Sequence, residues 1–285
     1  AGLGTRLLPA TKEQPKEMLP VFAEVAHDAI CLKPVLQLIF EQLCRSGFTE
    51  VCFIIGRGKR AIEDHFTPDD SYISFLNSRG KRREAAALTE FYEMVNRTKI
   101  LWATQPEAIG FGDAVLRAEP FVGDSEFLVH AGDTYVISEG DQHLSRLLGV
   151  HRNLRADTTF FVRRVLDPKQ YGLAMGTGIG EGVYRIQEVV EKPDVPQTDL
   201  AIMPVYMFKS TIMEALRSAP PGKDGEIQLT DGIQGLIDVG GSVYAIELRD
   251  DEVSLDIGSP ERYWEALATS YQRIGQRRVS AKHNQ

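Results

Sequence analysis

The feature that most constrains the fold is the alternation of short apolar runs with amphipathic helical patterns. Residues 33–47 place their apolar side chains on one helical face, and residues 51–56, VCFIIG, follow as a buried strand pattern. The alternation repeats with a charged helical pattern at about 81–95 and a strand pattern at 99–104. Strands separated by helices are typical of βαβ units, so we predict an α/β fold on a mixed, mostly parallel sheet flanked by helices.

The second half of the chain carries more strand patterns and fewer helices between them. The strand patterns are TTFFVRRV, GVYRIQEVVEKP, LAIMPVYMF and SVYAIEL, and the alternating glycines of MGTGIGEGV indicate a hairpin turn. A helix over DAVLRAEPFV is expected to end at Pro120. No repeat or long linker divides the chain. We predict one domain over 1–258, with halves at about 1–135 and 136–258, followed by a C-terminal helix and tail over 259–285.

Composition excludes several classes of protein. The net charge of −8 over 285 residues argues against general nucleic-acid binding. The three cysteines form no CxxC pair, and their odd number argues against a disulfide framework, so we expect reduced thiols and a cytoplasmic location. No apolar run reaches the roughly 18 residues of a membrane span. The six histidines lack metal-ligand spacing. Ala1 already lies inside a motif, so we expect a strand ahead of it.

The opening stretch, AGLGTRLLPATKEQPKEMLP, combines a glycine turn with spaced cations. Gly2 and Gly4 let a backbone approach a ligand closely. Arg6, Lys12 and Lys16 follow in a proline-stiffened loop, and such fixed cations suit phosphate groups. The stretch is neither a Walker A loop nor a full dinucleotide-binding fingerprint. A solvated charged loop is the alternative reading of these residues alone.

Two aspartates each end an apolar run. Asp133 follows FLVHAG, and Asp256 follows EVSL. Ligands of open α/β sheets bind at the carboxyl ends of the strands, and hard carboxylates suit Mg²⁺. Taken singly, either residue could instead cap a helix or a turn.

Taken together, the motifs resemble those of the sugar-phosphate nucleotidyltransferases, whose signature is GxGTRxxPxTxxxPKxMLP. TQPEAIGFGDAVL, AGDTYV, YGLA, EVVEKP, GEIQLTDGI and SLDIGSPERYWEAL have counterparts in the same order, from Ala1 to about Tyr271. The Lys-Glu before MLP is most similar to the bacterial and archaeal uridylyltransferases. Residues 23–32 are longer than in typical bacterial members, and Thr134 stands where a second acidic residue is frequent. The resemblance implies a Rossmann-like doubly wound fold of the nucleotide-diphospho-sugar transferase type.

The resemblance also implies roles for individual residues of the first half, which would be the nucleotide-binding half. Arg6 and Lys16 would hold the triphosphate and, with Lys192, form the catalytic set. Gln105 would present its amide to the uracil edge, and Gly110 would give the base room. The implied nucleotide-binding residues are Ala1, Gly2, Gly4, Gln105, Gly110 and Asp133.

In the second half, the resemblance implies a sugar-phosphate site. Glu191 would accept hydrogen bonds from sugar hydroxyls, Lys192 would pair with the sugar phosphate, and Gly172 would let the sugar lie against the backbone. Asp133 and Asp256 would hold Mg²⁺.

The implied reaction joins UTP and glucose 1-phosphate into UDP-glucose and pyrophosphate, by in-line attack on the α-phosphorus in a homo-oligomer (a dimer or tetramer). Three alternatives stay open at this point. A related thymidylyltransferase or another sugar-1-phosphate nucleotidyltransferase would carry similar motifs. A non-catalytic sugar-nucleotide-binding protein could share the fold. A dinucleotide-dependent oxidoreductase is suggested by Gly2 and Gly4 alone.

Overall fold

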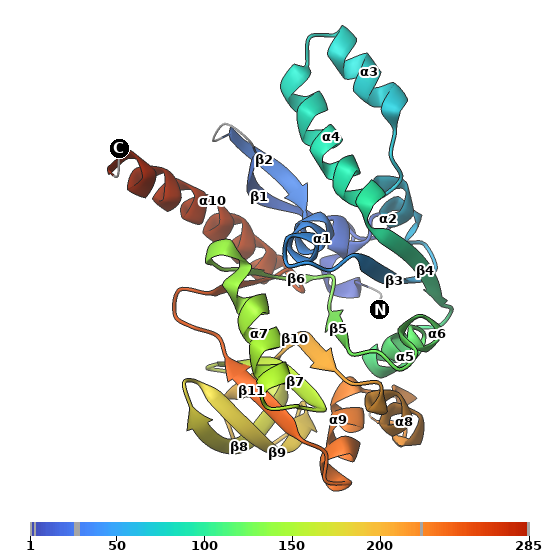
Figure 1. The fold of residues 1–285 in the computed structure, drawn as a ribbon, viewed down its shortest axis with the longest axis vertical. Helices are drawn as coiled ribbons and strands as arrows, with labels where there is room; N and C mark the ends of the chain where they lie inside the picture. The colour runs from blue at the N-terminus through green and yellow to red at the C-terminus, as the bar shows by residue number, and fades with distance from the viewer. Residues whose placement is uncertain (1, 3, 26–28, 223–224, 284–285) are drawn as a thin grey trace.

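The first half of the chain builds a pair of parallel strands covered by helices (Figure 1). The computed structural model describes residues 2, 4–25, 29–222 and 225–283. Phe40 of α1 centres an aromatic cluster, its ring lying 5.1 Å from that of Phe66 and 6.2 Å from that of Phe91. The elements of this part are η1 Thr5–Leu7, η2 Lys16–Met18, α1 Val35–Arg45, β3 Glu50–Gly56, α2 Arg60–His65, α3 Asp70–Ser78, α4 Arg82–Arg97 and β4 Lys99–Gln105.

The unusually long segment around residues 23–32 forms most of a β-hairpin, β1 Pro20–Val25 and β2 Ala29–Pro34. Its middle, 26–28, lies outside the described residues. The hairpin packs on the long C-terminal helix α10, Pro260–His283. Two hydrogen bonds join them: the backbone N–H of Phe22 donates to Ser270 Oγ (3.2 Å), and the Tyr263 hydroxyl donates to the Pro20 carbonyl (2.9 Å).

The second half forms a six-stranded sheet in the order β5-β10-β7-β11-β9-β8. Only β7 and β11 pair in parallel within it. A separate antiparallel pair, β6 and β12, joins residues far apart in the chain. The elements are α5 Phe111–Leu116, α6 Glu119–Val122, β5 Phe127–His130, β6 Thr134–Ile137, η3 Glu139–Asp141, α7 Gln142–Asn153, β7 Thr158–Arg164, η4 Pro168–Gln170, β8 Gly172–Gly180, β9 Val183–Glu191, β10 Leu200–Phe208, α8 Thr211–Ser218, α9 Leu229–Asp238, β11 Val243–Glu247 and β12 Val253–Asp256.

Helices cover both faces of this sheet (Figure 1). Phe160 and Phe161, adjacent in β7, point to opposite faces because side chains alternate along a strand. Phe161 packs with Leu144 and Leu147 of α7, whereas Phe160 packs with side chains of α5, α8 and α9. Phe160, Phe161, Leu144 and Leu147 are fully buried. The sheet is therefore closely packed on both faces, and it holds the residues at its edges in fixed positions.

The predicted α/β class, with a mixed sheet flanked by helices, is confirmed. The described pairings are mostly antiparallel, however, and parallel pairing is limited to β3–β4 and β7–β11. The reason is connection length, since a two-residue link such as that between β8 and β9 can join only antiparallel strands. The MGTGIGEGV hairpin is confirmed, with Gly180, Glu181 and Gly182 at positive φ in its turn.

The helix expected to end at Pro120 is divided differently. α5 ends at Leu116, and Pro120 lies in the first turn of a second helix, α6. Proline is tolerated there because the first-turn N–H groups have no partner within the helix. The short helix α3 was not expected at all.

β3 and β5 each pair on one side only within the described part of the chain, β3 with β4 and β5 with β10. Residues of both strands line a common cavity. The strand expected ahead of Ala1 lies outside this sequence and stays a prediction.

The described residues contain no helix that is both long and apolar enough to cross a membrane. All three cysteines are free, as expected, and burial raises the pKa of each thiol.

Two histidines, the fully buried His143 and the partly buried His130, have no charge partner among the described residues close enough to keep them protonated. Burial lowers the pKa of His130 to about 4, and burial together with nearby His130 does the same to His143. Nδ1 of His143 lies 2.6 Å from Ser138 Oγ, while Nε2 of both rings lacks a hydrogen-bond partner among the described atoms. Both rings are therefore neutral in the folded protein near neutral pH.

These two rings predict a loss of stability in mild acid. Because the unfolded histidines titrate near 6.5 and the folded ones near 4, the unfolded state binds more protons between those values. We expect the free energy of unfolding to fall by about 1 kcal/mol per histidine between pH 7.5 and 5.5. Urea unfolding across this range measures the slope, which should be shallower in His143→Gln. A flat profile, or an unchanged slope in the variant, would contradict this prediction.

Candidate active site

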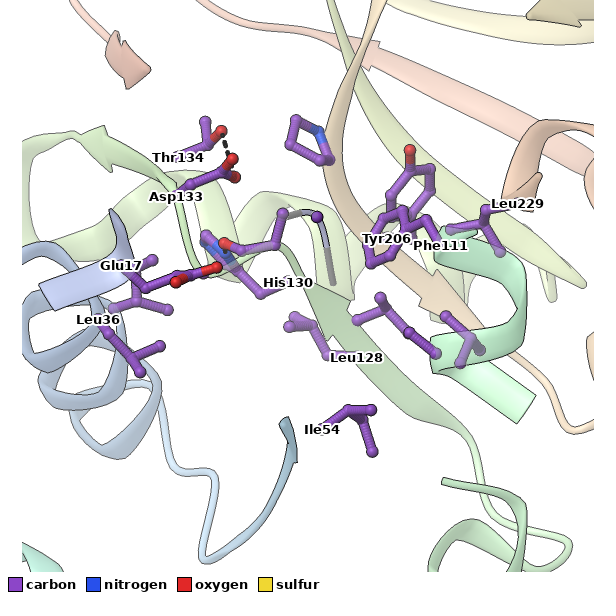
Figure 2. Close-up of a pocket in the computed structure, with 18 of the residues that line it drawn as sticks. Glu17, Leu36, Ile54, Phe111, Leu128, His130, Asp133, Thr134, Tyr206 and Leu229 are labelled. Atoms are coloured by element: carbon purple, nitrogen blue, oxygen red, sulfur yellow. Dashed lines mark hydrogen bonds between the residues drawn. The ribbon is translucent and has the colours of Figure 1, made fainter. Parts of the chain in front are cut away.

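One large cavity is lined by residues from much of the chain, and its lining includes most of the predicted site residues. The cavity has a volume of about 1110 Å³. Figure 2 shows Glu17, Leu36 and Asp133 on one side and Phe111, Tyr206 and Leu229 on the other, with His130 and Leu128 between them. The predicted residues that line it are Gly2, Gly4, Arg6, Lys16, Gly110, Asp133, Gly172, Glu191, Lys192 and Asp256. Ala1 lies outside the described residues, and Gln105 lines a smaller adjoining cavity of about 280 Å³ together with Gly2, Gly4 and Lys16.

The two aspartates, 123 positions apart in the sequence, are brought together by the β6–β12 pair. Asp256 lies opposite Thr134, and the N–H of Ile257 donates to the Asp133 carbonyl at 3.2 Å. The Thr134 hydroxyl lies 3.5 Å from Asp133 Oδ1 (Figure 2). Neighbouring strand ends thus hold both carboxylates at one edge of the cleft, as predicted from the apolar runs before them.

Each of these carboxylates has a basic partner. Lys16 Nζ donates to Asp133 Oδ2, and Arg262 Nη1 donates to Asp256 Oδ2 at 2.6 Å. Burial works against the charge on Lys16, but Asp133, Glu17 and Asp256 together outweigh it, so the pKa of Lys16 lies above its ordinary value. Lys16 is therefore a fixed positive charge at working pH.

The glycine turn precedes this lysine. Gly4 has φ +67°, a conformation that favours glycine, and its carbonyl accepts a hydrogen bond from Thr11 Oγ1 at 2.7 Å. The space beside the Gly2 Cα is open to 4 Å. Arg6 is exposed at the mouth of the cavity. This edge of the cleft thus offers accessible backbone and a mobile cation.

Gln105 and Gly110 form a packed unit. Gln105 is 2% exposed, and its Nε2 donates to Asp113 Oδ2 (2.9 Å) and to the Gly110 carbonyl (3.0 Å). Gly110 has φ +112°, and a Cβ there would lie 2.3 Å from the Ile227 carbonyl. The glycine is required by the close approach of Ile227, a different reason from the expected room for a base. The contact of either residue with a nucleotide stays a prediction.

This packing predicts a large stability effect for Gly110→Ala. The new methyl group would overlap backbone atoms of Ile227, and alanine is strained at this φ. We expect a loss of about 3 kcal/mol in the free energy of unfolding, measured with urea. Gly149→Ala is the control: Gly149 lies in α7 with open space at its Cβ, so stability should rise by about 0.5–1 kcal/mol. Equal effects at the two positions would contradict this account.

The cavity lining also includes Glu191 and Lys192, at and just after the end of β9. Glu191 Oε2 accepts a hydrogen bond from Thr230 Oγ1 at 2.7 Å, and Glu191 Oε1 lies 3.1 Å from Lys192 Nζ. Lys192 has φ +41°, and its side chain is half exposed. Gly172 lies opposite Glu191 in the β8–β9 pair, and a Cβ there would lie 3.0 Å from Glu191 Oε2. The arrangement leaves one cation free to turn toward a ligand beside a fixed carboxylate.

Sequence reasoning missed two ion pairs that support these residues. Glu17, next to Lys16, is bound by Lys59 Nζ at 2.7 Å, and both side chains are largely buried. Arg262 also contacts Tyr171, just before Gly172. The charged residues within the family motifs PKEMLP and GSPERYW were the available signal, but their partners lie far away in sequence.

The donor set suits a divalent cation. Asp133 and Asp256 offer hard carboxylate oxygens, about one fifth exposed, at adjoining strand ends. No group of three or more His, Cys, Asp or Glu side chains with metal-binding geometry occurs in the described ranges. A cation held by two carboxylates would take its other ligands from water or a substrate, which is typical of Mg²⁺ at phosphates.

A glycine turn, fixed cations and paired carboxylates around one α/β cleft define an enzyme class that handles phosphate esters. A profile of the nucleotidyl transferase family matches residues 1–273, and the chain belongs to this family. The UTP–glucose-1-phosphate uridylyltransferase of Pseudomonas aeruginosa is 35% identical over 280 residues, covering 96% of this chain and 94% of the relative.

Solved structures agree with this assignment. A crystal structure of apo UDP-glucose pyrophosphorylase superposes with a TM-score of 0.84 at 29% identity. A complex of UDP-glucose pyrophosphorylase with UDP-glucose gives 0.78 at 30% identity. In both cases the match covers 96% of each chain.

Proposed function

We propose that this protein is a UTP–glucose-1-phosphate uridylyltransferase that makes UDP-glucose and pyrophosphate. The observation that carries the proposal is the presence of two charged pairs in the lining of one cavity. One pair is Lys16 with Asp133, and the other is Glu191 with Lys192. The names of the relatives and of the structural neighbours agree with this choice of substrates.

On the nucleotide edge, the Gly2–Gly4 turn would admit the nucleoside close to the backbone. Arg6 and Lys16 would bind the triphosphate, and Lys16, whose pKa is raised, keeps its charge throughout. Fixed donors aimed at the charge that develops on the leaving pyrophosphate stabilise the transition state. Gln105 and Gly110 would form the wall beside the base.

On the sugar edge, Glu191 would accept hydrogen bonds from sugar hydroxyls, oriented by Thr230. Lys192 would swing from Glu191 to the phosphate of glucose 1-phosphate, because half of its side chain is exposed and free to move. Gly172 would let the sugar lie against β8. A phosphate oxygen so positioned attacks the α-phosphorus in line, the bond to the β-phosphate oxygen breaks, and pyrophosphate leaves without a covalent enzyme intermediate.

Asp133 and Asp256 would hold a divalent cation, the class of metal typical of this family, and we propose Mg²⁺. When bound, the ion would neutralise phosphate charge. The aspartates contribute by fixing two ligand positions on rigid strand ends.

We further propose a homo-oligomer, a dimer or tetramer, working in the cytoplasm. Trp264 and Tyr271 of α10 are two helical turns apart on one face and are 69% and 54% exposed. Tyr271 packs on Phe22 of β1, whose partner in β2 is Leu32, 55% exposed. An apolar strip of this kind is typical of a subunit interface. Light scattering on the purified protein measures the subunit number, and a monomer would contradict this part of the proposal.

A panel assay tests the proposed substrates. Pyrophosphate release is measured from UTP, dTTP, ATP and GTP, each with glucose 1-phosphate and with galactose 1-phosphate, with and without Mg²⁺. We expect the highest kcat/KM with UTP, glucose 1-phosphate and Mg²⁺. A preference for dTTP would identify a thymidylyltransferase instead, and binding of UDP-glucose without turnover would identify a non-catalytic binding protein.

A further inference from the structure

Arg262, in the first turn of α10, joins a carboxylate of the candidate metal site to the loop before the sugar edge. Its Nη1 donates to Asp256 Oδ2 at 2.6 Å. Its Nη2 donates to the Tyr171 hydroxyl at 2.7 Å and lies 3.4 Å from Gln170 Oε1. The guanidinium also lies 5.2 Å from the centre of the Tyr171 ring. One side chain therefore joins the carboxylate of Asp256 to the side chains of Tyr171 and Gln170.

Asp256 does not depend on Arg262 for its orientation. The backbone N–H of Gly258 donates to Asp256 Oδ1 at 2.7 Å, so the other carboxylate oxygen is already fixed by the chain. The backbone of Asp256 is held by pairing with Thr134 in β6. What Arg262 adds at this carboxylate is mainly positive charge.

Asp133 is paired with a basic side chain in the same way, since Lys16 neutralises its negative charge as Arg262 neutralises that of Asp256. The two candidate metal ligands are thus neutralised by two basic side chains, Lys16 and Arg262, and all four residues line the same cavity. A divalent cation at these carboxylates has to compete with both. Lys16 has a proposed role at the triphosphate after such a displacement, whereas Arg262 has none in the reaction as described above.

We propose that Arg262 is a positioning residue that competes with the divalent cation for Asp256 and thereby sets the metal affinity of the free protein. Tyr171 already binds the guanidinium while Arg262 is paired with Asp256, and its ring and hydroxyl remain as partners of Arg262 once Asp256 is taken by the cation. The inference rests on the proposed function, because it takes Asp133 and Asp256 as the metal ligands.

The inference gives opposite signs for two substitutions. Arg262→Gln removes the competing charge while Gly258 still orients Asp256, so the cation should bind more tightly. Tyr171→Leu removes these remaining partners of Arg262, so the guanidinium stays on Asp256 and the cation should bind more weakly. In the double variant the effect of Tyr171→Leu should vanish, because it acts only through Arg262.

Binding of Mn²⁺ alone, without nucleotide or sugar, tests this directly. Electron paramagnetic resonance measures free Mn²⁺ in titrations at fixed ionic strength. We expect Arg262→Gln to bind about three- to tenfold more tightly than the wild type, the range for a partly exposed charge-assisted pair. Tyr171→Leu should bind about threefold more weakly, and Arg262→Lys, which keeps the charge, should stay within about twofold of the wild type.

Arg273→Gln is the matched control. Arg273 lies on the same helix and contacts only the Asp251 carbonyl among the described hydrogen bonds, so its loss changes net charge equally without touching the site. Its Mn²⁺ affinity should equal that of the wild type. Equal or weaker Mn²⁺ binding by Arg262→Gln overturns the inference, and this includes the case in which neither protein binds.

The metal assignment itself is tested separately with Asp133→Asn and Asp256→Asn. Both should lose Mn²⁺ binding. Unchanged Mn²⁺ affinity in both would overturn the metal site of the proposed function and the inference with it. If both Asn variants lost Mn²⁺ binding but Arg262→Gln bound Mn²⁺ no more tightly than the wild type, only the role of Arg262 would be overturned.

Discussion

Replacing Asp133 by Asn is expected to lower kcat for UDP-glucose formation by at least about 100-fold. Asparagine keeps the shape of the side chain but removes the charge that a divalent cation and Lys16 both need. Because Asp133 is held next to the start of β6, a neighbouring carboxylate cannot easily move into its place and restore the lost charge. Pyrophosphate release at saturating UTP and glucose 1-phosphate, over a range of Mg²⁺ concentrations, is the measurement.

The control for this substitution is Asp124→Asn. Asp124 is exposed in the turn after α6, so kcat should stay within about twofold of the wild type. Circular dichroism should show both variants folded, since Asp133 lies at the surface of the cleft. A kcat of Asp133→Asn close to that of the wild type would show that Asp133 is not needed for catalysis.

Replacing Lys192 by Met is expected to lower kcat/KM for glucose 1-phosphate by about 100-fold or more, while KM for UTP changes less than about threefold. Methionine keeps the length of the side chain but cannot pair with a phosphate. We expect the effect to be specific for the sugar phosphate because Lys192 contacts Glu191, whereas Lys16 is paired with Asp133.

Lys99→Met is the matched substitution at an exposed lysine, in β4, that pairs only weakly with Glu50 at 3.2 Å. Its kinetic constants should match those of the wild type. If Lys192→Met raised KM for UTP as strongly as KM for glucose 1-phosphate, the division of the cleft into two edges would be wrong.

The sequence predicted those elements whose signal is local. The apolar face that predicts α1 and the runs before Asp133 and Asp256 depend on neighbouring residues, and the structure has them where expected. The placement of both aspartates at strand ends followed from the same runs. The prediction that Lys16 and Lys192 belong to one site came from family motifs, and both residues line the same cavity.

Features set by contacts between distant segments could not be predicted. Arg262 contacts Tyr171, 91 positions away in the sequence, and Lys59 contacts Glu17, 42 positions away. No local sequence pattern therefore predicts either contact. The constraint at Gly110 comes from Ile227, a residue far away in the sequence. The start of α6 at Glu119, with Pro120 in its first turn, depended on where the preceding helix ended, which local signals place poorly.

The measurement that tests the central claim most directly follows the label of UTP carrying ³²P at the α position, in the presence of glucose 1-phosphate, Mg²⁺ and purified protein. The account predicts that the label appears in UDP-glucose in equal amount to the unlabelled pyrophosphate released. It also predicts that UTP labelled at the γ position yields labelled pyrophosphate. Label remaining in UTP, or appearing in UMP or UDP without UDP-glucose, would contradict the transfer of a uridylyl group to the sugar phosphate.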